Sequence, residues 1–75
     1  MRRVSWKELI NLPNGTYLRE EERGRPFFGI VLTKIHYDFK NNEVIFREVE
    51  TGRLVVTNEQ EANELFNYYV LWEEK

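Results

Sequence analysis

The segment from Ser5 to Gly15 has the pattern of a short helix that is capped at its start and stopped by a turn. Ser5 and Glu8 stand three residues apart, which is the spacing of a capping box. Apolar residues then recur at the spacing of one helical face: Trp6, Leu9 and Ile10. Pro13 cannot continue a helix, and the Pro-Asn-Gly sequence favours a turn.

Most of the remaining chain alternates apolar and polar residues, which is the pattern of β-strands. This pattern predicts five strands, at residues 16–22, 27–37, 43–50, 54–56 and 68–72. The connections among the first four are short, which favours antiparallel neighbours in chain order. Gly52 can adopt a positive φ in the hairpin turn before the short strand 54–56, which we expect to be buried.

The strand at 27–37 has the strongest pattern, because it is rich in aromatic and β-branched residues. Both of its faces begin apolar and only one ends so, which predicts a long strand that bends from one side of a barrel to the other. Gly29 is a suitable place for the bend or a bulge. The run Glu20-Glu21-Glu22 is expected on a sheet edge or in solvent.

A second helix is predicted over residues 59–66. Thr57 or Asn58 can cap it, the glutamates at 59 and 61 favour its N-terminus, and its apolar stripe consists of Ala62, Leu65 and Phe66. The element order predicts a single domain spanning residues 1–75, of the α+β or mostly β class. We expect a small five-stranded antiparallel SH3-like barrel or strongly bent sheet, with a short N-terminal helix and a short helix before the last strand.

Two resemblances add to this expectation. Residues 50–72, with Asn67-Tyr68-Tyr69-Val70 in the closing strand, resemble the last third of an SH3-like barrel. The opening from Trp6-Lys7-Glu8-Leu9 to Leu12-Pro13-Asn14-Gly15-Thr16, the short length and the richness in Glu and Tyr resemble small phage and prophage proteins. Some of those proteins inhibit bacterial defence systems, so this resemblance implies an anti-defence role, anti-CRISPR-like or other. It implies no functional residues.

Composition narrows the classes of protein further. The chain has 75 residues and no Cys, so disulfides and thiolate metal sites are excluded, which fits a cytoplasmic location. No stretch approaches the ~20 apolar residues of a membrane span, and the two N-terminal arginines precede no apolar run, so we expect neither a membrane anchor nor a signal peptide. The net charge of −2 argues against a general nucleic-acid binder.

The sequence contains few residues that could act as a nucleophile, a general base or a phosphate-binding loop. Ser5 is the single Ser and has a capping role, His36 is the single His, and the four glycines form no phosphate-binding loop. We therefore expect no enzymatic activity and no cofactor. His36, Asp38 and Glu43 could face one metal ion, but a lone His beside a polar turn is more typical of a solvated surface, so no metal is expected.

One group of basic and aromatic residues suggests a nucleotide or single-stranded nucleic-acid site, because arginines beside aromatic rings on a curved sheet can hold phosphates and stack bases. Its members are Arg19, Arg23, Arg25, Phe27 and Lys34, with Tyr17 and Tyr37 beside them. The competing interpretation is that Phe27 and Phe28 belong to the core and that the arginines pair with the Glu20–Glu22 run. The acidic net charge favours this second interpretation.

The leading functional hypothesis is a non-enzymatic protein-binding module that occupies a surface of a larger, host-encoded partner. Two Trp, four Tyr and five Phe exceed what so small a core readily hides, and exposed Tyr and Trp mark interfaces. The acidic second half could compete for a basic groove; its glutamates could equally be a solvated helix face. Self-association through an edge strand at 54–57 or 68–72 is a further alternative. The candidate contact residues are Tyr37, Phe39, Glu59, Glu61, Tyr68 and Tyr69.

Overall fold

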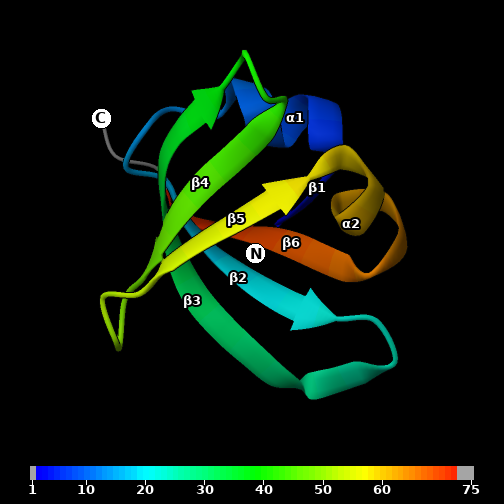
Figure 1. Ribbon diagram of the computed structural model, residues 1–75. Helices are drawn as coiled ribbons and strands as arrows, with labels where there is room; N and C mark the ends of the chain where they lie inside the picture. The colour runs from blue at the N-terminus through cyan, green and yellow to red at the C-terminus, as the bar shows by residue number, and fades with distance from the viewer. Residues whose placement is uncertain (1, 73–75) are drawn as a thin grey trace.

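Six strands and two short helices make up the part of the chain that the computed structural model describes, which is residues 2–72 without the side chains of Pro26 and Phe27. In chain order they are β1 (Arg2–Val4), α1 (Trp6–Asn11), β2 (Tyr17–Glu22), β3 (Arg25–Asp38), β4 (Glu43–Glu48), β5 (Leu54–Asn58), α2 (Glu59–Glu64) and β6 (Phe66–Trp72) (Figure 1). Neither helix in this range has the length or apolar character to cross a membrane.

All strands belong to one antiparallel sheet in the order β1-β6-β2-β3-β4-β5. The α+β, mostly β class is confirmed, and so is the sequential pairing from β2 to β5. The expected five strands are wrong, because Arg2–Val4 adds a sixth by pairing with β6. The sheet bends strongly, but β1 and β5 are its two edges and no ladder joins them within residues 2–72, so it does not close into a barrel.

Two irregularities shape the long strand β3. The pairing of β2 with β3 shifts beyond Glu21 and Gly29, beside the glycine where an irregularity was predicted. A second shift, which the sequence did not predict, lies between Lys34 and His36 and leaves Ile35 as the extra residue of a bulge against β4. Bulges increase local twist, which helps this sheet curl around its own core.

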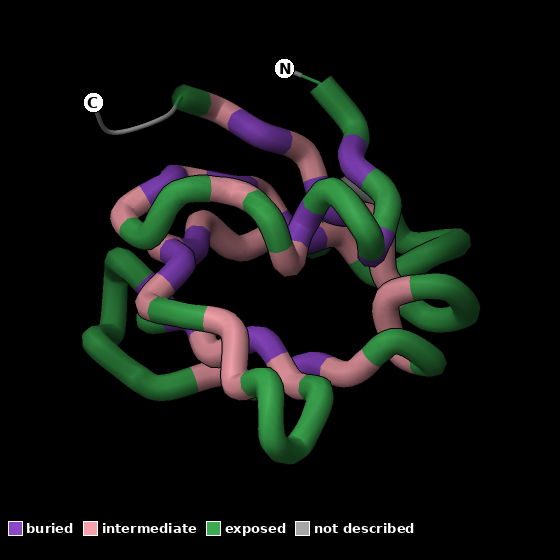
Figure 2. Tube along the Cα trace, turned by 90° about the horizontal axis from the view of Figure 1, so that it is seen from above, coloured by how far each residue is buried: buried purple, intermediate pink, exposed green. Residues whose placement is uncertain are grey.

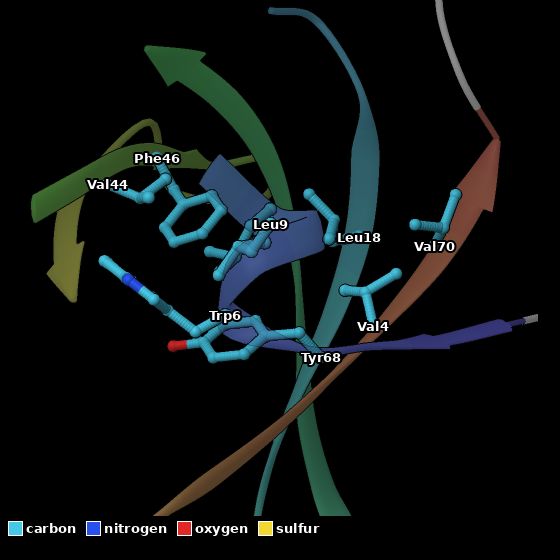
Figure 3. Packing of buried hydrophobic residues seen from close by; sticks show 9 residues of the cluster. Val4, Trp6, Leu9, Leu18, Val44, Phe46, Tyr68 and Val70 are labelled. Carbon is cyan, nitrogen blue, oxygen red and sulfur yellow. The ribbon is translucent and has the colours of Figure 1, made fainter. Parts of the chain in front are cut away.

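The core lies on the inner, concave side of the sheet, where α1 packs across it (Figure 3). The rings of Phe46 and Tyr68 stack there with centroids 5.6 Å apart. Figure 2 shows that buried residues alternate with partly buried ones along most strands, as a sheet with one covered face requires. The buried apolar residues are Val4, Trp6, Leu9, Leu18, Leu32, Val44, Phe46, Tyr68 and Val70.

Local chemistry sets the starts of both helices as predicted. The Ser5 hydroxyl accepts a hydrogen bond from the Glu8 backbone N–H, and the Glu8 carboxylate accepts one from the Ser5 N–H, which completes the capping box. Asn58 caps α2 by accepting from the Glu61 N–H at 2.9 Å. Helix α2 ends at Glu64, earlier than predicted, because Phe66 joins the sheet as the first residue of β6.

Three burial predictions were wrong, each because of a strand's place in the sheet. Glu20 is buried, since β2 lies between β6 and β3 and turns this carboxyl inward. Leu54 and Val56 are 56% and 47% exposed, because β5 is an edge strand that buries only its alternate residues. The 68–72 segment is no edge at all, since β6 has a neighbour on each side.

Candidate functional site

The outer face of the sheet, on the side away from the core, brings residues from all six strands into adjacent rows. Antiparallel register places alternate residues opposite one another across neighbouring strands. Two such rows, called the outer rows below, run as Arg3–Tyr69–Arg19–Val31 and as Trp72–Tyr17–Thr33–Arg47–Leu54.

A bulge in β6 puts Trp72 on this face. Leu18 pairs with Val70, but the next partners are Tyr17 and Trp72, so Leu71 is an extra residue in the ladder. Without it, strict alternation would turn Trp72 to the opposite face. The Trp72 ring instead stacks on Tyr17, with centroids 4.5 Å apart and 23° between the planes, and Trp72 remains 54% exposed.

Arg19 belongs to the same face, and its guanidinium reaches Gly29 on the neighbouring strand β3. Because Gly29 has no side chain, it leaves the space that the Arg19 guanidinium occupies; the Cβ of any other residue at this position would collide with the guanidinium. Arg19 Nε donates to Glu21 Oε2 at 2.8 Å, and the side chains are 30% and 15% exposed. The ion pair holds the guanidinium over Gly29 on β3, and its terminal amino groups donate no hydrogen bond within residues 2–72.

Two further arginines extend the cationic character of the outer rows. Arg3 is exposed at the β1 end, and Arg47 is exposed on β4, where its guanidinium donates to the Gly52 carbonyl at 2.9 Å. The outer rows themselves contain no carboxylate; Glu21 lies one position beyond them and is committed to Arg19. The face therefore combines half-exposed Trp and Tyr rings with three guanidinium groups.

The residues predicted to bind nucleic acid are not brought together. Lys34 is buried, and its amino group donates to the carbonyls of Ile10 and Leu12 at 3.0 and 2.7 Å, which holds the end of α1; burial lowers its pKa. Arg23 donates to the Asn67 side chain and the Ala62 carbonyl. Arg25 lies over the ring of Phe28 at the β2–β3 turn, away from Arg19. The Phe27 side chain lies outside the described part.

The residues predicted to bind protein occupy four separate places. Tyr37 packs edge-on against both Trp6 and Phe39, and Phe39 is 85% exposed beside the β3–β4 turn. Glu59 and Glu61 stand in the first turn of α2. Tyr69 belongs to the outer rows, whereas Tyr68 faces the core. The structure thus places Tyr69 next to Arg19 and near Tyr17, two residues that the sequence had assigned to a different function, and it adds Trp72.

Tyr68 is part of a buried polar pair that the sequence did not reveal. Its hydroxyl donates to Glu20 Oε2 at 2.6 Å on the inner face of the sheet. Burial raises the pKa of the Glu20 carboxyl, and burial together with the neighbouring carboxylate raises the pKa of Tyr68. No pocket opens onto this pair within the described residues, so it has the geometry of a structural bond and gives a substrate no access.

The polar turn suggested as a metal site is occupied by local hydrogen bonds. The Asp38 carboxylate accepts from the Lys40 and Asn41 backbone N–H groups and from the Asn41 side chain, and these bonds lower its pKa. Across residues 2–72, no cluster of three potential ligand side chains could hold a metal ion. In comparisons with protein families, curated proteins and solved structures, nothing matches this chain.

Proposed function

We propose that this chain is a non-enzymatic protein-binding module whose contact surface is the outer rows. The observation that supports the proposal is one continuous face carrying Trp72, Tyr17, Tyr69 and three arginines. Trp, Tyr and Arg are the residue types that dominate binding energy at protein interfaces. A sheet holds them in fixed positions, so ordering them on binding costs little entropy.

The chemistry of the outer rows also suggests the kind of surface that they meet. Guanidinium groups recognise carboxylates with paired hydrogen bonds, and rings beside them bury apolar area. The partner surface would therefore carry carboxylates around an apolar centre. This differs from a basic groove, which the acidic residues of α2 would meet instead.

For the biological role, we propose a phage-encoded inhibitor of a host or defence protein. It rests on the resemblance of the opening sequence and composition to small phage proteins. The SH3-like description of residues 50–72 is likewise a proposal, supported by the strand, helical turn and closing strand found there.

The test is a tagged pull-down from bacterial lysate, followed by binding measurements with the partner that mass spectrometry identifies. Trp72→Ala and Arg19→Glu should each weaken binding by roughly 30-fold or more, as expected for hot-spot residues. Phe39→Ala is the matched control, because Phe39 is more exposed than Trp72 but lies outside the outer rows. A partner whose affinity drops with Phe39→Ala and ignores Trp72→Ala would contradict the proposal.

A second candidate is single-stranded nucleic-acid binding at the same face, favoured by the Tyr17–Trp72 stack in the same row as Arg47. Bases stack on exposed rings, and guanidinium groups neutralise phosphates. Fluorescence anisotropy with short oligonucleotides should then show binding that weakens with salt and with Arg47→Glu. Absence of binding at ~50 mM salt removes this candidate, and leaves the protein-binding proposal unaffected.

A further inference from the structure

The two edges of the sheet differ in how well they are protected against pairing with another strand. Exposed edges are normally guarded by charges, proline or bulges. The β1 edge carries Arg2 and Arg3 in three residues. The β5 edge, Leu-Val-Val-Thr-Asn, contains no charge, no proline and no glycine, and its pairing with β4 is regular over all five residues.

The exposed side of β5 is apolar as well as uncharged. Leu54 and Val56 project to the outer face and are about half exposed, while Val55 packs against the core and Thr57 is buried. Val49, in the neighbouring turn after β4, is also 51% exposed. An apolar, unguarded edge is a ready template for a further strand.

The charged residues immediately before and after β5 indicate which strand could pair with this edge, and in which register. Arg53 precedes the strand and Glu59 follows it, and both are exposed. In an antiparallel pair of two β5 strands with Val56 opposite Val56, each residue before Val56 in one copy faces the residue the same number of positions after Val56 in the other copy. Leu54 then meets Asn58, and Arg53 of each copy meets Glu59 of the other at both ends.

We propose that β5 pairs antiparallel with β5 of a second copy of this chain, about a two-fold axis at Val56, to form a symmetric dimer with one continuous sheet. The symmetric register brings opposite charges together twice, whereas parallel pairing would set Arg53 against Arg53. Arg53 also bonds the Glu48 carboxylate at 3.2 Å while its side chain stays 65% exposed, so it is held near this end of the strand. This inference concerns the β5 edge and shares only Leu54 with the outer rows.

The experiment is sedimentation velocity across roughly 1 to 500 µM protein, because an interface of one strand edge is small and gives a weak dimer. We expect a concentration-dependent dimer that Val56→Lys shifts to monomer. Val49→Lys is the matched control: it adds the same charge at a similarly exposed valine outside β5 and should leave the dimer intact. Trp72→Ala should also leave it intact, which separates this inference from the proposed function.

Charge exchange tests the register. Glu59→Arg should weaken the dimer at least about tenfold, and adding Arg53→Glu should restore it. Circular dichroism confirms folding of each variant. If Arg53→Glu does not fold, because Glu48 loses its ion-pair partner, Glu59→Arg and Val56→Lys test the proposal. A monomer at every concentration would overturn the inference, and so would a dimer that is unaffected by both of these variants.

Discussion

The hydrogen bond between Tyr68 and Glu20 gives the sharpest test of how this small sheet is stabilised. Tyr68→Phe removes one hydroxyl and leaves the ring, with its stacking on Phe46, in place. Glu20 then keeps its buried position but loses the donor that lies 2.6 Å from its carboxylate. Tyr69→Phe is the matched control, because it removes a hydroxyl from the next residue on the half-exposed outer side.

The size of the effect follows from burial. A hydrogen bond to a charged group contributes roughly 1.5–3 kcal/mol, and its loss inside a protein leaves the remaining group unsolvated. We therefore expect Tyr68→Phe to lower the free energy of unfolding by about 2 kcal/mol, which corresponds to a Tm decrease of roughly 10 °C for a domain of this size. The control should change the free energy of unfolding by less than about 0.5 kcal/mol.

The pH dependence gives an independent check on Glu20. Because burial raises its pKa above the ordinary 4.5, the unfolded chain releases this proton at a lower pH than the folded protein does. The contribution of this carboxyl to stability is fully present below that ordinary value and is lost as pH rises through the folded-state pKa. Glu20→Gln lacks this loss, so its stability relative to wild type should improve as pH rises from about 4 to about 8.

Urea denaturation followed by far-UV circular dichroism, at several pH values, measures both effects. A double-mutant cycle with Tyr68→Phe and Glu20→Gln gives the coupling energy of the pair. The reasoning is refuted if Tyr68→Phe is as mild as Tyr69→Phe. A stability difference between Glu20→Gln and wild type that stays constant with pH would show that the carboxyl is not perturbed by burial.

Two further predictions concern the buried Lys34 and Gly29, the glycine that leaves space for the Arg19 guanidinium. Lys34→Met keeps an apolar stem but leaves the Ile10 and Leu12 carbonyls without their donor, so denaturation should show a loss of about 1–3 kcal/mol; a variant as stable as wild type would mean that α1 needs no such bond. Gly29→Ala should keep the fold but displace the Arg19 guanidinium, so partner binding should fall as in Arg19→Ala. Unchanged binding would show that the resting place of Arg19 is irrelevant.

Local patterns were sufficient to predict the elements whose determinants lie within a few residues. The capping box of Ser5 and Glu8, the positive φ of Gly52 and the sequential strands β2 to β5 are all local features, and the structure confirms them. Strand β1 was not predicted because three residues with one apolar side chain carry no periodicity. It exists because β6, more than sixty residues later, presents an edge to it.

The candidate site was predictable only in part, because it depends on register. Arg19 and Tyr69 were singled out as residue types, but their adjacency follows from the pairing of β2 with β6. The bulge at Leu71, which turns Trp72 outward, has no signal in the sequence. Glu20 and Lys34 have the sequence pattern of surface charges, but the structure buries Glu20 beside the Tyr68 hydroxyl and Lys34 beside two backbone carbonyls, and no local pattern could reveal these partners.

The central position of β6 imposes an order on folding. This strand separates β1 from β2, so neither can complete its pairing until residues 66–72 are available. During synthesis, the meander from β2 to β5 can form while the inner face near Leu18 still lacks its neighbours Val70 and Tyr68. Such distant pairings slow folding, because loop closure is needed before any contact is gained. A nascent chain stalled before residue 66 would therefore expose much of its core to chaperones and proteases.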